Sequence, residues 1–272
     1  MLGVVLLAVA GFLALDRMIG GTTTTSQTFD APRVVELVTD GRVTVTTGGS
    51  DVDVQAIARS GIRSPRFSSE MVGDRLVITH ECSRRFGLNL GRCSGALEVT
   101  LPADTEVITR VSNGAVSVSG LSGDVDLRTS NGRIEATNIG GRLQAVTSNG
   151  AINALNVDGD AHLRSSNGRI DATRIGGALD AQTSNGAINA NDIGLDARVQ
   201  TSNGRVDVAA VAGNVSARSS NGAVTVRGTG EPVRLTISTT NGRQTVEGAT
   251  SPDAARTVEI RSTNGAVAFL GP

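Results

Sequence analysis

The feature that most constrains this chain is an Asn-Gly pair that returns at a nearly fixed interval from residue 112 onward. Six consecutive intervals are 18 residues, and the last two are 20 and 23. The pairs begin at Asn113, Asn131, Asn149, Asn167, Asn185, Asn203, Asn221, Asn241 and Asn264. A fixed period of this length is typical of stacked repeat architectures, in which each repeat packs against its neighbours. The chain is therefore expected to be a repeat protein.

One repeat, residues 131–148, contains two short runs in which apolar and polar residues alternate. Ile134 and Ala136 belong to the first run, and Leu143 and Ala145 to the second. A period of two indicates β-strands, and a Gly-Gly pair between the runs indicates a turn. Equivalent positions in successive repeats would stack about 4.8 Å apart in parallel sheets. The pattern predicts an all-β fold, a single-stranded parallel β-solenoid with coils of about 18 residues. Its coil is expected to be right-handed, as parallel crossovers usually are.

The Asn-Gly turn has a chemistry that suits such a stack. Asparagine tolerates the left-handed backbone region, and glycine lacks the Cβ atom that opposes it, so we expect left-handed turns there. Stacked asparagine side chains can also hydrogen-bond along their column, as they do in other β stacks. We expect one such column along the solenoid.

The residue after each Asn-Gly pair alternates strictly between alanine and arginine. The series is Ala115, Arg133, Ala151, Arg169, Ala187, Arg205, Ala223, Arg243 and Ala266. Two positions later, carboxylates accompany three of the arginine repeats, at Glu135, Asp171 and Asp207. Alternation separates like charges by two strand spacings, roughly 10 Å, which is about one Debye length at 0.1 M salt. We expect each arginine to pair with the carboxylate on its own strand, in a 36-residue double coil.

The chain before residue 112 follows the same pattern less regularly. Residues 40–45 repeat the Gly-Arg-Val signature, and residues 94–99 form a second divergent copy. We interpret residues 28–111 as irregular first coils of the same solenoid, interrupted by an insertion over residues 59–92, with a separate first domain as the alternative. Residues 112–272 then form the regular solenoid, and residues 1–27 an N-terminal anchor and linker.

Residues 2–15 form an uncharged apolar run of 14 residues followed by Asp16 and Arg17. This length suits the apolar part of an export signal and falls short of the roughly 20 residues of a spanning helix. No basic segment precedes the run and no convincing cleavage site follows it, so we expect missing upstream residues and a retained anchor. The predicted location is the bacterial cell membrane, with the solenoid on the extracytoplasmic side.

Three segments resemble a known family. They are the repeated Ser-Asn-Gly turns, residues 40–54 (DGRVTVTTGGSDVDV) and residues 97–107 (LEVTLPADTEV). Over roughly residues 30–270 the chain resembles the bacterial "putative adhesin" family of unknown function, whose members are commonly membrane-anchored. The resemblance implies a surface-exposed solenoid and supplies no active-site residues.

Composition excludes several functions. Lys and Arg total 25 against 26 for Asp and Glu, so no net positive field would attract nucleic acid. The chain has no Trp and no Tyr, which removes the usual stacking platforms for sugars. Nucleotide-binding, hydrolase, zinc-protease and calcium-repeat motifs are also absent from the sequence. No cofactor is expected.

The two cysteines, Cys82 and Cys93, are separated by a loop, residues 83–92. After an export signal they indicate one disulfide. A metal site that adds His80 is the alternative, but it supplies three of the four ligands of a structural zinc site. We therefore predict a disulfide and no metal.

The loop between the cysteines is the one place where basic and apolar side chains concentrate. We identify Arg84, Arg85, Phe86 and Arg92 as candidate binding residues for an anionic envelope polymer, lipid headgroups or a protein. The alternative, which we favour, is that Phe86 and its leucine neighbours cover the end of the solenoid core.

A polar cluster is the best candidate for catalysis. Alignment of the repeats stacks Asp124, Arg142 and Asp160 in one outward column, with His162 in the next. These groups could supply an acid, a base and an electrostatic stabiliser. An alternating Asp-Arg-Asp column is also what a solvated strand face needs to avoid like-charge stacking, and we favour that interpretation.

The sequence thus favours a non-enzymatic surface protein, an adhesin, binding or scaffold module, that presents a repetitive face to an envelope component or partner. A carbohydrate-active enzyme that uses the polar cluster is one alternative. A self-associating spacer is another, in which residues 264–270 form the last coil and leave an open edge for end-to-end pairing.

Overall fold

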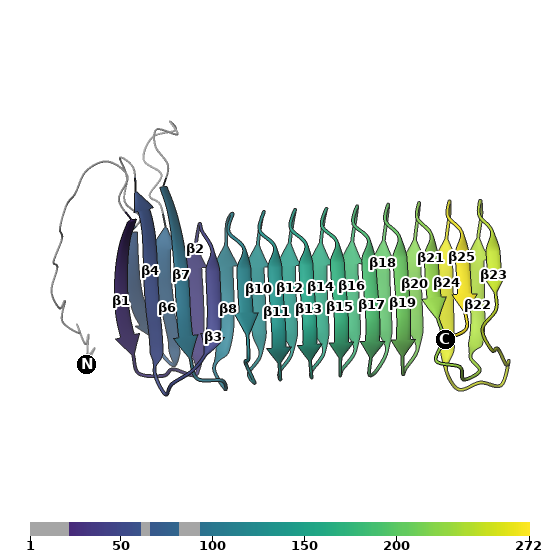
Figure 1. Ribbon diagram of the computed structural model, residues 1–272, viewed down its shortest axis with the longest axis horizontal. Coiled ribbons are helices and arrows are strands. Elements are labelled where there is room, and N and C mark those ends of the chain that lie inside the picture. Colours follow the sequence, from purple (N-terminus) through teal and green to yellow (C-terminus); the bar gives the residue numbers. More distant parts are fainter. Residues whose placement is uncertain (1–21, 61–65, 82–92) are drawn as a thin grey trace.

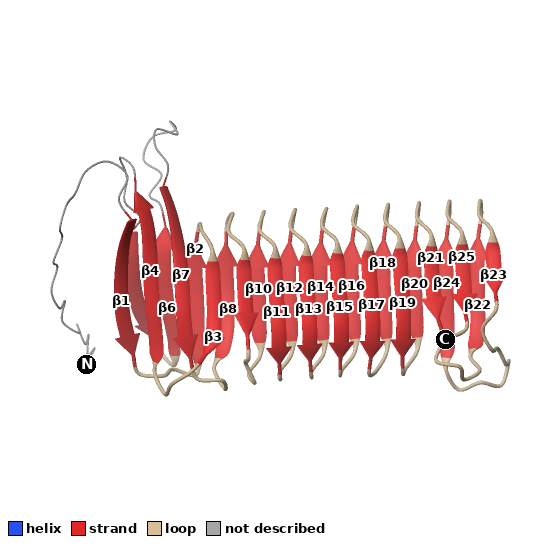
Figure 2. Ribbon diagram, viewed as in Figure 1, coloured by secondary structure: helices blue, strands red, loops and turns tan. Residues whose placement is uncertain are grey.

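The computed structural model describes residues 22–60, 66–81 and 93–272. Within these ranges the chain consists of strands joined by turns and loops, and no helix long and apolar enough to cross a membrane is found. Two sheets lie against each other along an elongated rod (Figures 1 and 2). The predicted all-β solenoid is confirmed.

The described strands form two sheets, here called sheet A and sheet B. Sheet A contains, in spatial order, β1 (Thr22–Phe29), β4 (Val52–Ser60), β7 (Cys93–Leu101), β3 (Val43–Thr47), β9 (Val116–Ser119), β11 (Ile134–Ile139), β13 (Ile152–Val157), β15 (Ile170–Ile175), β17 (Ile188–Ile193), β19 (Val206–Val211), β21 (Val224–Arg227), β25 (Val267–Leu270) and β23 (Gln244–Val246). Sheet B contains β22 (Arg234–Thr239), β24 (Thr257–Ser262), β20 (Val215–Ser219), β18 (Ala197–Thr201), β16 (Leu179–Thr183), β14 (Ala161–Ser165), β12 (Leu143–Thr147), β10 (Val125–Thr129), β8 (Glu106–Val111), β2 (Val34–Thr39), β6 (Arg75–Glu81) and β5 (Arg66–Val72). Neighbouring strands are parallel except in the pairs β1–β4, β4–β7 and β5–β6.

Each regular coil has two faces, because it consists of one strand from each sheet and two turns. Val125 of β10 pairs with Leu143 of β12, and Ile134 of β11 pairs with Ile152 of β13. The inward-facing aliphatic side chains of both sheets form one continuous buried core. Full burial of a Val, Leu or Ile side chain contributes about 1.5–3 kcal/mol, so this core is the main favourable term in folding.

The asparagines of the Asn-Gly turns form the expected hydrogen-bonded column. Asn131 donates from Nδ2 to Oδ1 of Asn113 at 2.7 Å, and the same bond recurs at each following coil up to Asn221. Next to the asparagines, a Thr or Ser hydroxyl also bridges coils, as Thr129 does by donating to the Gly114 carbonyl at 3.0 Å.

The glycines of these turns are required for a different reason from the one expected. The described glycines with a left-handed backbone are Gly49, Gly73, Gly120 and Gly230, and none of them belongs to an Asn-Gly pair. A Cβ atom on Gly150 would instead overlap the carbonyl oxygen of the glycine one coil earlier. The column therefore needs glycine because successive turns stack in backbone contact.

The left-handed backbone occurs in the second turn of the coil. Five residues there, 18 positions apart, have φ between 51° and 61°: Asn138, Asn156, Arg174, Asp192 and Ala210. Only asparagine and aspartate visit this region readily among residues with a Cβ atom. Arg174 and Ala210 therefore adopt it because the stacked neighbours impose their conformation.

The order of coils along the rod departs from chain order at the C-terminal end. Asn264 donates to Asn221 at 2.8 Å, and Asn241 donates to Asn264 at 2.8 Å, so the last coil in the sequence lies inside the rod. Our interpretation of residues 264–270 as the open edge is wrong, because β25 lies between β21 and β23 (Figure 1). The longer intervals of 20 and 23 residues give the chain room to cross one coil.

A similar exchange occurs at the N-terminal end. Val43 of β3 pairs with Leu97 of β7 on one side and with Val116 of β9 on the other. The exchange keeps the charge alternation, since Arg42 then lies between two alanine coils. At the C-terminal end two alanine coils adjoin instead, because Val224 pairs with Val267.

The antiparallel strands close the N-terminal end of the rod. β1 begins at Thr22, inside the segment that we assigned to the anchor and linker, and β5 and β6 form a hairpin within the expected insertion. Phe29 and Phe67 are partly buried against the core there. Residues 1–21, which include the apolar run, and residues 82–92 lie outside the described residues.

Candidate binding face on sheet B

The outer face of sheet B carries a row of arginines along the rod axis. They occupy one column of the register, which contains no carboxylate from β8 to β24 and is interrupted by Val146, Gln182 and Gln200. We call Arg110, Arg128, Arg164, Arg218 and Arg261 the arginine stripe. Their side chains are between 40% and 59% exposed. The guanidinium groups are therefore held on the sheet and remain accessible to solvent.

Carboxylates hold these arginines in place from the adjacent column. Asp126 accepts two hydrogen bonds of 3.0 Å from Arg128. Glu259 binds two arginines: its Oε2 lies 2.7 Å from Nη2 of Arg218, and its Oε1 lies 2.6 Å from Nε of Arg261. Arg128 also has its pKa raised, by the hydrogen bond and the charge of Asp126. Each carboxylate thus orients guanidinium groups along the stripe.

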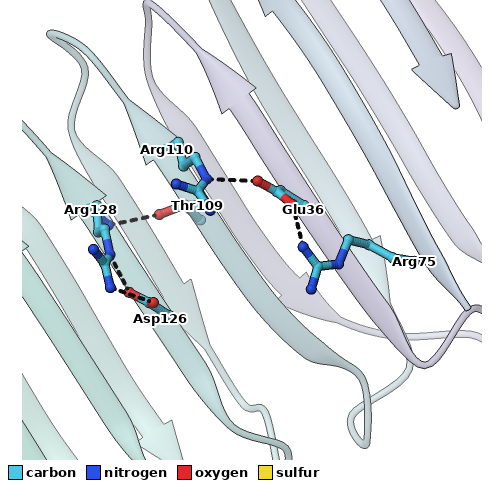
Figure 3. A network of polar contacts seen from close by, with 6 residues as sticks. All are labelled: Glu36, Arg75, Thr109, Arg110, Asp126 and Arg128. Atoms are coloured by element: carbon cyan, nitrogen blue, oxygen red, sulfur yellow. Dashed lines mark hydrogen bonds and ion pairs between the residues drawn. The ribbon is translucent and has the colours of Figure 1, made fainter. Parts of the chain in front are cut away.

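The most enclosed pair involves Glu36 on β2, whose side chain is 12% exposed. Its carboxylate accepts from Arg75 at 2.8 Å and from Arg110 at 2.7 Å (Figure 3). Burial by itself raises the pKa of Glu36, but the hydrogen bonds and charges of Arg110 and Arg75 outweigh it and leave the pKa lowered. This cluster links three neighbouring strands near the N-terminal end.

The same forces act at the other end of the stripe. The hydrogen bond from Arg218 lowers the pKa of Glu259, burial opposes this, and the charges of Arg218 and Arg261 add to the lowering. Glu36 and Glu259 lie far apart in the sequence, but each binds two arginines, one pair near each end of the same face.

Two of the predicted catalytic candidates have a clear structural role. Asp124 accepts from the backbone N–H of Arg142, and Asp160 from that of Ala178, both at 2.8 Å. Asp196 makes the same bond to Asn214. These aspartates recur every 36 residues and tie the second turn of one coil to the next.

The structure brings the four candidates onto one face, as expected. Asp124, Arg142 and Asp160 follow one another in the column that precedes the sheet B strands. His162 lies beside Asp180, with 3.8 Å between Nδ1 and Oδ2. The carboxylates of Asp124 and Asp160 accept backbone hydrogen bonds, which gives both residues a structural role. Catalysis by this cluster remains a prediction.

A shallow cavity of about 390 Å³ lies over this part of the face. Its lining includes Asp160, His162, Asp180, Arg198 and Glu259. Its lining also includes Ala178, Ala197 and Ser216, whose side chains are small. It offers polar contacts of both signs beside the arginine stripe.

The opposite face, on sheet A, carries simpler pairs. Of the three pairs predicted from the sequence, Arg205 and Asp207 form no ion pair within the described residues. In the other two, Arg133 lies 3.3 Å from Glu135 and Arg169 lies 2.9 Å from Asp171, each arginine directly before the strand that carries its carboxylate. All four side chains are more than one third exposed, so each pair contributes little to stability. These arginines are separated by alanine coils.

His80 on β6 is the one predicted metal-site residue whose side chain is described. It is buried at 2% exposure, its Nδ1 has no hydrogen-bond partner, and Phe67 lies beside it. Burial lowers its pKa. Within the described ranges no group of three or more His, Cys, Asp or Glu residues could hold a metal ion.

The predicted binding loop and disulfide fall outside what the structure describes. Cys82, Arg84, Arg85, Phe86 and Arg92 are outside the described residues, and so is the side chain of Cys93. The disulfide and the loop therefore remain predictions.

Sequence reasoning missed the Glu36 cluster and the arginine stripe. Glu36 meets Arg75 and Arg110 across separations of 39 and 74 residues, which no local pattern marks. The 18-residue spacing of Arg110 and Arg128 was a usable signal for the stripe.

The stacked coils and the charged outer columns define the chain as a two-sheet parallel β-solenoid repeat protein. The family described as Toastrack DUF4097 matches residues 38–269, and the chain belongs to this family. No curated protein matches the sequence.

Solved structures similar to this chain share little of its sequence. One described as a putative adhesin from Bacteroides fragilis is 11% identical, with a TM-score of 0.51, over 92% of this chain and 97% of that one. A putative lipid binding protein from Parabacteroides distasonis is 14% identical, with a TM-score of 0.48, over 91% and 96%. A putative adhesin from Parabacteroides merdae is 12% identical, with a TM-score of 0.39, over 92% and 96%. At these identities the first structure supports the fold alone.

Proposed function

We propose that the protein is a non-enzymatic, extracytoplasmic binding module that recognises an anionic polymer of the cell envelope through the arginine stripe. The stripe is the observation that carries the proposal, because it places five partly exposed guanidinium groups in one register column along an extended face. A polymer that bears carboxylate or phosphate groups could follow the stripe and contact several coils at once.

The chemistry of arginine suits this role. A guanidinium group has five N–H donors in a planar fork that matches carboxylate and phosphate. Arg128 uses two donors for Asp126, and the others remain for a ligand. Because the carboxylates already fix the side chains, less rotational entropy is lost on binding.

The same proposal includes the location. The apolar run of residues 2–15 would hold the chain at the bacterial membrane, with the rod on the outer side. The solved structure described as a putative adhesin is consistent with a role at a surface. Fractionation of cells that express the full chain should recover the protein with the membranes.

The binding test uses the full chain in detergent with three probes: polygalacturonate, long-chain polyphosphate and the neutral polymer dextran. We expect binding to one or both anionic polymers, weakening with salt, and none to dextran. The two anionic probes distinguish carboxylate from phosphate recognition.

A matched pair of variants locates the site. Arg128→Gln with Arg164→Gln removes two members of the stripe, and Arg133→Gln with Arg169→Gln removes two paired arginines from sheet A. A hydrogen bond to a charged group contributes about 1.5–3 kcal/mol, so the first pair should weaken binding at least roughly tenfold. Equal loss in both double variants, or no binding to either polymer, would overturn the proposal.

A further inference from the structure

The two ends of the rod differ in how the core is covered. At the C-terminal end, β22 and β23 are the outermost strands of their sheets (Figure 1). Their inward-facing side chains continue the core columns, since Ile237 pairs with Ile260 and Val246 pairs with Phe269. Ile260 and Phe269 are buried, whereas Ile237 is only partly buried and Val246 is 49% exposed. Residues 249–251 cover the end beside Val233, which is buried, and the core is left open over the rest of β22 and β23.

The N-terminal end is closed. Phe29 of β1 and Phe67 of β5 pack against the core there, and both outermost strands run antiparallel to their neighbours. The exposed part of β1 is formed by threonine, serine and glutamine side chains, which are poor partners for an apolar surface. The described N-terminal end is thus largely covered, and its exposed apolar core-column residue is Met71 of β5, which pairs with Leu76 and is 54% exposed.

We propose that this C-terminal end is a homodimer interface, in which β22 and β23 pair antiparallel with the same strands of a second copy. The backbone of β22 is arranged for such pairing. Arg234 donates its backbone N–H to the carbonyl oxygen of Arg256, on the side of β24. Along a parallel strand, residues that bond to one neighbouring strand alternate with residues whose backbone groups face the other side. Leu235, Ile237 and Thr239 therefore direct their N–H and C=O groups to the free edge, which is a template for another strand.

A second copy fits because the two strands are self-complementary about one axis. Ile237 and Val246 lie equally far from the turn that joins β22 to β23, so they face each other across the core. A two-fold axis that passes between Ile237 and its copy, and between Val246 and its copy, keeps inward side chains inward, because antiparallel partners have a constant sum of residue numbers. Ile237 then meets its own copy and Leu235 meets Thr239.

The same register avoids charge repulsion. Residues 249–251 already occupy the free edge of β22 beside Val233, so the pairing extends from Leu235 to Thr239. On sheet A, Glu247 would face Thr245 of the other copy, so no like charges lie directly opposite each other. An interface of one coil cross-section lies at the low end of specific contacts, below about 1,200 Å². We therefore expect a reversible, concentration-dependent dimer. Because β1 presents polar side chains at the other end, we expect association to stop at two copies.

The test measures the mass of the full chain in detergent by sedimentation over a wide concentration range. The parent should pass from monomer to dimer, and Ile237→Lys should remain monomeric. Met71→Lys is the matched control, since Met71 is an exposed apolar residue on β5 at the closed end. Circular dichroism checks that each variant stays folded, which is expected because both sites are partly solvent-exposed.

A second variant tests the register itself. Directly opposed residues of an antiparallel pair have Cα atoms about 4.5–5.5 Å apart, within disulfide range. Ile237→Cys should form a covalent dimer on mild oxidation, beyond the level seen for the parent chain with its own two cysteines. Met71→Cys should not. A parent that is monomeric throughout, a dimer that survives Ile237→Lys, or larger assemblies would overturn the proposal. The result is independent of polymer binding, because the arginine stripe takes no part in the interface.

Discussion

Asp160 accepts a hydrogen bond at Oδ1 from the backbone N–H of Ala178, 18 residues later, at 2.8 Å. The bond joins the second turns of two adjacent coils, and the same relationship at Asp124 and Asp196 repeats every 36 residues. The double coil is therefore marked in both turns, by arginine after one and by aspartate in the other.

Replacement of this carboxylate should weaken the stack. We expect Asp160→Ala to lower the free energy of unfolding by about 1–3 kcal/mol, because a charge-assisted hydrogen bond is lost and the N–H of Ala178 loses its acceptor. Asp160→Asn keeps an oxygen acceptor and should cost less. Urea denaturation measures both. Asp158→Ala, in the same turn, is the control, because the Asp158 carboxylate makes no hydrogen bond or ion pair within the described residues, and it should change stability by less than about 0.5 kcal/mol. An equal effect at both sites would contradict this account.

The glycine column should tolerate no side chain. Gly150→Ala places a Cβ atom onto the Gly132 carbonyl oxygen, and the stacked backbone cannot move without disturbing both neighbours. We expect a loss of more than about 3 kcal/mol, or failure to fold, measured by thermal unfolding. Gly271→Ala is the control, since a Cβ atom there meets nothing within 4 Å. A Gly150→Ala protein of parental stability would show that the column does not need backbone contact.

The Glu36 cluster should make stability depend on pH. Because the folded pKa of Glu36 lies below its ordinary value of 4.5, the cluster stabilises the fold above that value, and this contribution is lost as pH falls from 4.5 toward the folded pKa. Urea midpoints between about pH 6 and 3 should fall more steeply for the parent than for Glu36→Gln. Glu135→Gln removes an exposed carboxylate on the other face and should leave the slope close to that of the parent. A parental slope in Glu36→Gln would refute the assignment.

Much of the solenoid could be predicted from the sequence because its interactions join residues at a constant separation. The column of Asn131 and Asn149, the paired strands of each coil and the ion pair of Arg169 with Asp171 all follow from the 18-residue period and its alternation. The site was harder. The candidate cluster of Asp124 and Asp160 was placed on the correct face, but the backbone bonds that occupy it depend on turn geometry.

What the sequence by itself determined is the coil: its length, its two strands, its Asn-Gly turn and the alternation of charge. Each is a local or periodic property, repeated often enough to be legible without a structure. Only the tertiary structure decided which coils are neighbours at the two ends, where Asn264 lies between Asn221 and Asn241, and where Glu36 meets Arg75 and Arg110. The reason is that a coil has nearly the same edges on both sides. Chain order alone therefore does not determine whether the next coil stacks outward or crosses over its neighbour, and the packing of the end coils determines it.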